Sequence, residues 1–229
     1  LFASGGVMTP GVDPRSPSYT QDELTAGVEE AHKAFRVVGA HAQAADGIKN
    51  AIRAGVDSIE HGVWLDEEAV ALMVERGTYM VATLTAPFHI AHGASSGIPP
   101  YMVDKGQQVL EDHIASFRAA TQAGVNLAMG TDQGTPLSRP GENAQEILRL
   151  AEHGLSNGAA IMAATGWAAD LLHVDAGRIS EGLLADFAVF EDDPLMNLAV
   201  LADGSQVAAV VKDGSVFRHP HHSRSEVTR

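Results

Sequence analysis

One unit recurs along residues 20–132 and limits the folds open to this chain: an amphipathic helix, then a short apolar run that ends on a polar residue. We predict helices over residues 20–35, 46–54, 66–76 and 104–123, and strands over residues 36–42, 56–62, 78–84 and 125–132. Gly55, Gly77 and Gly124 end three of these helices, as glycine does by supplying the left-handed residue after the last turn. Helices that alternate with short strands predict parallel βαβ units.

The helix starts carry signals of their own. Thr20 and Glu23 have the spacing of a capping box, and Asp66 and Ser156 are the expected N-caps of two later helices. Phe35 stands where the other units have glycine, so the end of the first helix is less sharply defined.

Each predicted strand of residues 20–132 ends on a polar side chain that could bind a ligand or act in catalysis. These residues are His41, His61, Thr83 and Asp132. Parallel strands bring their carboxyl ends to one edge of the sheet, where α/β proteins place their active sites. A single histidine there is more often structural, but two histidines and an aspartate at equivalent positions favour a Zn²⁺ or similar divalent metal site.

The pattern changes after Asp132. Two helical stretches follow, over residues 141–154 and 156–174, and then a β-rich segment without helices. Alternating apolar residues on both sides of Asp213-Gly214 predict a hairpin in a small antiparallel sheet. Residues 218–229 show no periodicity, and we predict a disordered tail.

Charge and composition narrow the partners. The formal net charge of −14 argues against nucleic acid and anionic membranes, and no apolar run has the length of a membrane span. The chain has no cysteine, which excludes disulfides and thiolate chemistry and favours the cytoplasm, although the location itself is not determined. We expect a small-molecule substrate, and a homo-oligomer is left open.

Several phrases together carry a family resemblance. They are "ASGGVMTPG", "AHA" at His41, "AGVDSIEHG" at His61, "MGTDQGTP" at Asp132, "NAQEI", "AATGWAADLL" and "GRISEGLLADFAVFEDDPL". In this order and spacing the chain resembles the C-terminal portion of a metal-dependent amidohydrolase, of the branch with imidazolonepropionase-like enzymes and Xaa-Pro dipeptidases.

The resemblance implies a fold and domain boundaries. Residues 1–176 would form part of a (β/α)8 TIM-type barrel, about strands five to eight, with Leu1 and Phe2 ending strand four. Residues 177–217 would form the C-terminal part of a small β-sandwich domain.

The resemblance also implies roles. His41 and His61 would bind one of two Zn²⁺ ions, and Asp132 would bind the other and move the proton of the attacking water. A carboxylated lysine directly before Leu1 would bridge the ions. Ser4, Gly5 and Trp64 are the candidate substrate contacts.

Some features of the family pattern are missing from this stretch. The His-x-His motif that supplies two ligands is absent, and we interpret His89 and His92, which we place in a loop, as non-ligands, along with three histidines after residue 218. "PGEN", residues 140–143, replaces a histidine-containing phrase of relatives. With only three ligands, we expect the 229 residues alone to bind metal poorly and to be inactive.

The predicted function is hydrolysis of C–N bonds by metal-activated water, with a dipeptide or an N-acyl amino acid as substrate. Alternatives within the superfamily are deamination or opening of a cyclic amide, and hydrolysis of a lactone or a phosphoester. A truncated, non-catalytic fragment is another alternative. "GASSG", residues 93–97, matches the serine-hydrolase motif at Ser95, but Pro99-Pro100 should not open a helix promptly, so we regard the match as chance.

Overall fold

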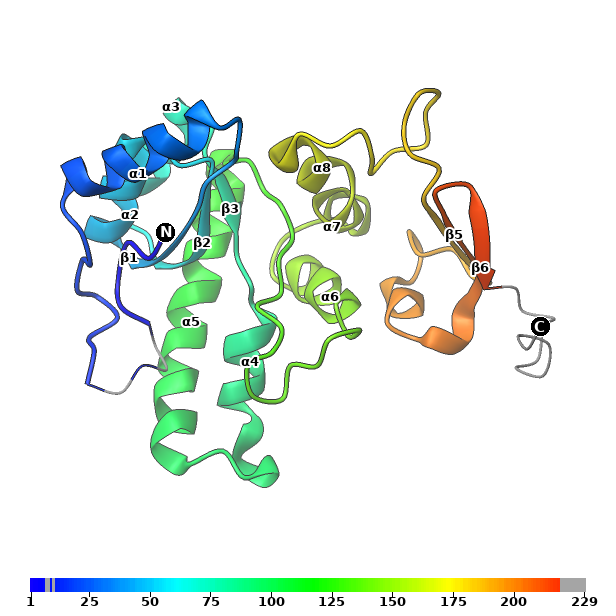
Figure 1. Ribbon diagram of the computed structural model, residues 1–229. Helices are drawn as coiled ribbons and strands as arrows, with labels where there is room; N and C mark the ends of the chain where they lie inside the picture. The colour runs from blue at the N-terminus through cyan, green and yellow to red at the C-terminus, as the bar shows by residue number, and fades with distance from the viewer. Residues whose placement is uncertain (7–8, 10, 219–229) are drawn as a thin grey trace, which may run out of the picture.

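A computed structural model describes residues 1–6, 9 and 11–218 (Figure 1). One of its sheets is parallel and contains β1 (Gly39–Ala44), β2 (Ser58–Trp64) and β3 (Tyr79–Val81) in that order. A parallel bridge from Phe2 to His41 adds the start of the chain to one side of this sheet, and a bridge from Met80 to Leu127 adds a later segment to the other. The segments therefore lie in the order of the sequence, as successive βαβ units require.

The helices between these strands follow the predicted signals. They are α1 (Gln21–Lys33), α2 (Ala45–Ala54) and α3 (Glu67–Arg76). Thr20 and Glu23 form the capping box, and the Asp66 carboxylate accepts a hydrogen bond from the Ala69 N–H as the N-cap of α3. The apolar sides of these helices pack with the strands into one core that contains Ile48, Ile59 and Met73.

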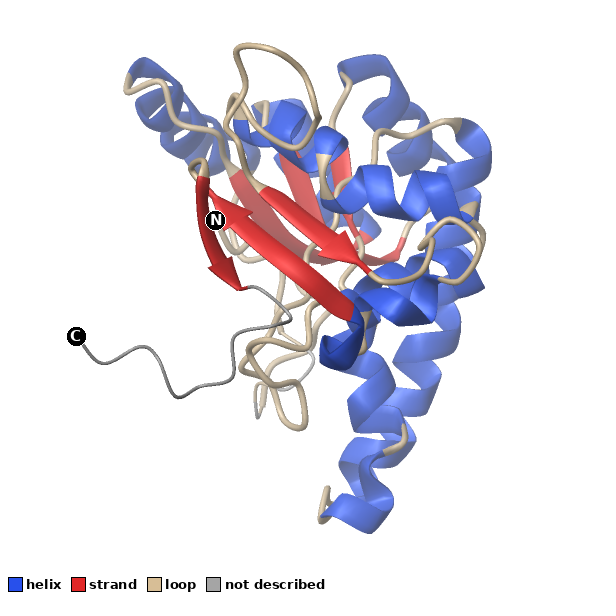
Figure 2. Ribbon diagram, turned by 90° about the vertical axis from the view of Figure 1, so that its right-hand side faces the viewer, coloured by secondary structure: helices blue, strands red, loops and turns tan. Residues whose placement is uncertain are grey.

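Two helices follow β3 where we predicted a loop and a later helix start. They are α4 (Thr85–Ala91) and α5 (Pro100–Ala123), joined by the short helix η1 (Gly93–Ser96). Figures 1 and 2 both show α4 and α5 side by side, extending beyond the sheet.

The predictions for residues 89–92 and for Pro99-Pro100 were therefore wrong. His89 lies in α4 and His92 caps it, because Pro87 occupies the first turn, where a helix does not use the missing N–H. Pro100 opens α5 directly, because proline is pre-organised for the first helical position.

The segment of residues 125–132 was predicted as a strand, but it forms a single bridge. The Ala128 N–H donates to Met80 O and the Met80 N–H donates to Asn126 O, so the segment runs beside β3. Beyond it lie α6 (Ala144–Glu152), α7 (Asn157–Ala164) and α8 (Gly166–Leu172). Thr165, with φ −129° and ψ −93°, separates α7 from α8, so the single helix predicted from residue 156 is two.

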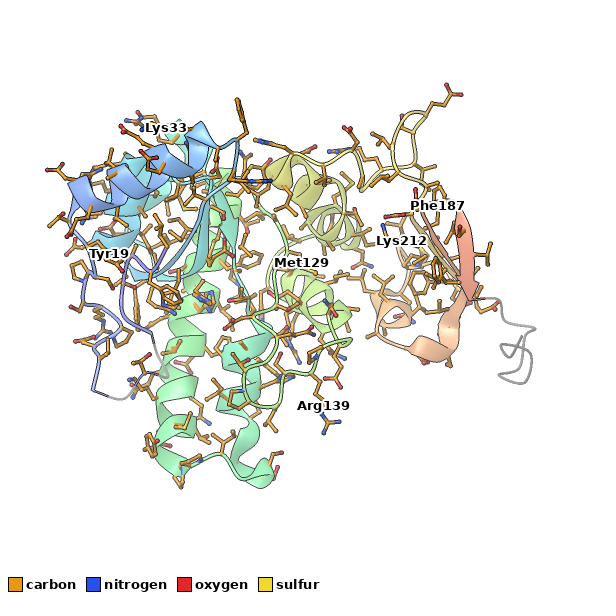
Figure 3. All side chains as sticks on the ribbon, viewed as in Figure 1. Tyr19, Lys33, Met129, Arg139, Phe187 and Lys212 are labelled. Carbon is orange, nitrogen blue, oxygen red and sulfur yellow. The ribbon has the colours of Figure 1, made fainter. Side chains whose placement is uncertain are left out.

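The remaining strands form the predicted antiparallel sheet. Its strands are β4 (Phe187–Phe190), β5 (Val207–Lys212) and β6 (Ser215–Arg218), with the short helices η2 (Leu198–Leu201) and η3 (Gly204–Gln206) between the first two. Asp213 and Gly214 turn the hairpin with positive φ, as predicted. Phe187 and Lys212 mark this sheet in Figure 3, on the far side of α6–α8 from the parallel sheet.

Two further predictions concern the C-terminal tail and membrane-spanning segments. Residues 219–229 of the predicted tail lie outside the described residues, and Arg218 ends β6. Within the described part of the chain, no helix combines the length and the apolar character that crossing a membrane would need.

Candidate active site

A cavity of about 470 Å³ opens at the carboxyl ends of the parallel strands. His41 from β1, His61 from β2, Thr83 after β3 and Asp132 all line it. The structure thus brings the three predicted site residues His41, His61 and Asp132 to one cavity, together with Thr83. The other polar residues of the lining are Thr9, Gln43, Glu60, His113, Thr131 and Thr135.

Three of these four residues have left-handed backbone, and β1 and β2 continue past His41 and His61. The φ angles are +74° for His61, +57° for Thr83 and +50° for Asp132. Non-glycine residues rarely adopt this region, and a β-branched residue such as threonine is a clear outlier there. Such strain costs on the order of 1–3 kcal/mol per residue and concentrates at functional sites. Three residues that line one cavity therefore have a strained backbone conformation.

The ring of His61 is held in one tautomer by Thr83. The Thr83 hydroxyl donates its only proton to Ala82 O at 2.6 Å, and its oxygen lies 2.7 Å from His61 Nδ1. The oxygen must therefore accept a hydrogen bond from Nδ1–H. This leaves Nε2 of His61 without a proton and able to bind a metal ion.

His41 lies edge to face with His61, with 4.7 Å between the ring centroids. Its Nε2 lies 3.4 Å from the carbonyl oxygen of Gly5, which can only accept a hydrogen bond, so Nδ1 remains unprotonated. Burial lowers the pKa of His41, and burial with the nearby His41 and His113 lowers the pKa of His61 to about 3. Two neutral imidazoles, each with a free nitrogen, are a donor set that fits Zn²⁺ or a similar divalent ion.

Asp132 lines the cavity and is exposed. Partial desolvation raises the pKa of its carboxyl group, and His41 opposes that rise. Within residues 1–6, 9 and 11–218, three or more histidine, aspartate or glutamate side chains do not gather closely enough to hold an ion by themselves. The described residues thus supply a histidine pair and a separate carboxylate.

Helix α5 fixes the main chain after His61. The Nε2–H of His113 donates to His61 O at 2.8 Å. The Ser116 hydroxyl donates to Val63 O at 2.8 Å and accepts from the Leu65 N–H at 3.1 Å. His113 and Ser116 are buried, so these bonds form away from water. Sequence reasoning did not identify either residue, because their partners lie more than 50 positions away.

One wall of the cavity is apolar and comes mainly from the α4–α5 pair. Ala86, Pro87 and Ile90 of α4 face Val109 of α5, and Val63 adds to the wall from β2. The described lining residues include no lysine or arginine. The cavity thus joins a histidine and carboxylate edge to an apolar wall, which suits a substrate with a polar reacting group beside an apolar group.

The predicted substrate contacts lie outside this lining. The Ser4 hydroxyl oxygen is buried and accepts a hydrogen bond from the Gln43 N–H, and the Gly5 N–H donates to Ser16 O. Trp64 donates from its indole N–H to Asp112 at 2.7 Å, and the Arg15 guanidinium lies 4.5 Å from the centre of its ring.

Ser95 lacks the setting of a hydrolase nucleophile. It is exposed in η1, between two helices, whereas the motif requires a strand before the serine.

Glu146 is a further residue whose place the sequence did not indicate. It lies in the phrase "NAQEI" on α6, is fully buried, and accepts hydrogen bonds from the N–H groups of Leu84 and Thr85. A glutamate in the first turn of an amphipathic helix is ordinarily exposed, and its distant partners were the missing information.

Comparison with known proteins gives concordant matches. The model of the amidohydrolase family matches residues 1–217. An ochratoxinase from Aspergillus niger is 34% identical over 224 residues, which are 96% of this chain and 46% of that protein. The chain thus spans about half the length of the curated relatives that it matches first.

Solved structures agree with these matches. A Xaa-Pro dipeptidase with bound methionine in the active site is 36% identical, with a TM-score of 0.86 over 95% of this chain and 53% of that one. A prolidase complexed with N-methylphosphonate-L-proline is 33% identical, with a TM-score of 0.87 over 95% and 54%.

Proposed function

The chain belongs to the amidohydrolase family, and from this membership we propose that the complete protein is a metal-dependent hydrolase of C–N bonds. The observation that carries the proposal is the convergence of His41 from β1, His61 from β2 and Asp132 on one cavity beside the parallel sheet. The active sites of α/β barrels lie at this end of the sheet.

We also propose that the parallel sheet is part of a (β/α)8 barrel. Support comes from the order of its segments. Residues 1–3, β1, β2, β3 and residues 125–128 follow one another across the sheet in the same order as in the sequence. In this proposal β1, β2 and β3 are strands five to seven, and the segment before Asp132 is strand eight.

The proposed roles follow from the donor set. His41 and His61 would hold one divalent ion through their unprotonated nitrogens, and Asp132 would contribute to a second ion with ligands from outside the described residues. Zn²⁺ suits imidazole and carboxylate donors. Such an ion supplies Lewis acidity, which acidifies water and polarises a carbonyl group.

Asp132 has the chemistry for the proton transfers. A carboxylate within hydrogen-bond reach of the attacking water can accept its proton and pass it to the leaving amine. Asp132 is exposed, and partial desolvation raises the pKa of its carboxyl group above the usual value for aspartate, which favours its action as a base. The left-handed backbone at Asp132 fixes the starting direction of this side chain.

The substrate class that we propose is a dipeptide or an N-acyl amino acid with an apolar side chain. The relatives named ochratoxinase, Xaa-Pro dipeptidase and prolidase support amide substrates. The apolar wall of α4 and α5 supports an apolar group next to the scissile bond.

A substrate panel tests the proposal. The complete protein that carries these 229 residues should hydrolyse members of a library of dipeptides and N-acyl amino acids, with apolar side chains preferred, and should lose activity with a chelator. Full activity in chelator together with inhibition by a serine-directed phosphonate would contradict it.

A further inference from the structure

A buried carboxylate holds the turn that follows β3. The two oxygens of Glu146 accept hydrogen bonds from the Leu84 N–H at 2.8 Å and from the Thr85 N–H at 2.7 Å. Glu146 is fully buried, and burial raises the pKa of its carboxyl group to about 7. An ionisable group is rarely placed in a protein interior without partners, so its two partners indicate what it stabilises.

Those partners are the first N–H groups of α4. The helix begins at Thr85, its N-cap residue Leu84 makes no side-chain capping bond, and the donors would otherwise be unsatisfied in the interior. Glu146 therefore provides from α6 the acceptor that the local sequence lacks.

We call the two hydrogen bonds from Leu84 and Thr85 to Glu146 the clamp. Thr83 directly precedes these two residues. Its φ of +57° is unfavourable for a β-branched residue, and such a conformation persists only where neighbouring structure holds it. The clamp on Leu84 and Thr85 is such a support. From this strained position the Thr83 hydroxyl reaches His61 Nδ1 at 2.7 Å.

We propose that Glu146 is a positioning residue: it holds Thr83 in the turn from which the threonine hydroxyl fixes the ring of His61, with Nδ1 protonated and Nε2 free. The relay therefore runs from a carboxylate on α6, through two main-chain N–H groups and one hydroxyl, to a histidine of β2. None of the three side chains of the relay is near another in sequence.

The part of the proposal that concerns ion affinity rests on the proposed function, because it takes His61 as a metal ligand. Residues that orient a metal-binding histidine through its second nitrogen typically change metal affinity 10-fold to 100-fold when replaced. The part that concerns the tautomer of His61 does not depend on the function.

Four variants of the complete protein test the relay. Thr83→Val replaces the hydroxyl with a methyl group of the same shape, and Thr83→Ser keeps the hydroxyl. Glu146→Gln keeps one acceptor but turns an NH₂ group toward the other main-chain N–H. Ser156→Ala is the matched control, because it removes the side-chain acceptor of a helix N-terminus, at α7, from a residue outside the cavity lining.

Two readouts separate positioning from stability. Long-range ¹H–¹⁵N spectra of the metal-free protein, with the His61 signal identified by its loss in His61→Ala, report which ring nitrogen is protonated. Competition with a chelator gives the affinity for Zn²⁺. We expect Nδ1–H in the wild type and in Thr83→Ser, and a mixture of tautomers in Thr83→Val and Glu146→Gln. Zn²⁺ affinity should fall roughly 10-fold to 100-fold in the last two and stay within about twofold in Ser156→Ala.

The outcomes against the proposal are distinct. A folded Glu146→Gln protein with an unchanged His61 tautomer and unchanged Zn²⁺ affinity overturns it. If Glu146→Gln does not fold, equal tautomer populations and affinities in Thr83→Val and Thr83→Ser overturn it. If Zn²⁺ leaves the His61 signal unmoved while the tautomer still responds to Glu146→Gln, the relay stands and the proposed function fails.

Discussion

The two ends of the parallel sheet turn the chain in the same backbone conformation with different residues. At the amino ends, where helices lead into strands, the left-handed positions are Gly55, Gly77 and Gly124. At the carboxyl ends, where strands lead into the cavity, they include His61, Thr83 and Asp132, with Gly62 directly after His61.

The difference distinguishes positions where the backbone only has to turn from positions where a side chain also lines the cavity. Glycine adopts positive φ without steric cost, so it serves where the chain has only to change direction. A side chain in the same conformation costs roughly 1–2 kcal/mol, which is retained where the side chain is needed. Left-handed non-glycine residues around one cavity thus mark the site by physical argument alone.

The largest effect should come from removing a proposed ligand. His61→Ala in the complete protein should lower turnover on the order of 10³-fold or more, because the ion loses one of its donors. Steady-state kinetics on the best substrate of the panel measure this. His92→Ala, which alters a histidine outside the cavity lining, is the control, and comparable activity in both variants would remove His61 from the site.

Asp132 allows strain and chemistry to be measured separately. Asp132→Gly and Asp132→Ala should both abolish turnover, but the glycine variant should unfold with about 1 kcal/mol more free energy than the alanine variant, because it relieves the φ of +50°. Urea denaturation of the two proteins measures the difference. An alanine variant as stable as the glycine variant would show that the backbone here is not strained.

The amino end should behave in the opposite way. Gly55→Ala should destabilise the protein by about 1 kcal/mol, the cost of a side chain at a φ of +97° less the unfolded-chain entropy removed with glycine, and should leave turnover unchanged. The nearest atom to an added methyl group is 3.6 Å away, so the effect is conformational rather than steric. Gly27→Ala, inside α1, is the control and should be neutral or slightly stabilising. A loss of turnover in a stable Gly55→Ala protein would contradict the assignment of a purely structural role to the amino ends of the strands.

The smallest effect concerns an exception at the amino end, where His173 after α8, with a φ of +53°, is another non-glycine residue in this conformation. Phe35 follows α1 with a φ of +55° and its side chain is 96% exposed, so it occupies a glycine position without packing against the core. Phe35→Gly should stabilise the protein by about 0.5 kcal/mol, the relief of strain less the larger entropy of glycine in the unfolded chain. Thermal denaturation detects the change, and destabilisation would instead indicate a contact made by the Phe35 ring.

The sequence predicted what local signals encode. Thr20, Glu23 and Asp66 act as caps, and Gly55, Gly77 and Gly124 close helices. The apolar runs also predicted strands at His41 and His61, although β1 and β2 continue past these residues to Ala44 and Trp64. The Asp213-Gly214 hairpin also follows from its own two residues. Each of these features depends on neighbours within a few positions.

The remaining features depend on contacts that are distant in sequence. The clamp of Glu146 on α4 joins residues about 60 positions apart, and that of His113 on His61 joins residues more than 50 apart. The left-handed backbone of Thr83 contradicts its β-branched preference, so no propensity predicts it. Pro87 and Pro100 misled because their cost depends on their position in the helix.

Metal analysis of the complete protein tests the central claim most directly. We predict two divalent ions per chain in the wild type, and the loss of about one ion, together with nearly all amide hydrolysis, in His41→Ala and in His61→Ala. A wild-type protein that hydrolyses amides without bound ions, or histidine variants that keep both ions and full turnover, would contradict the account.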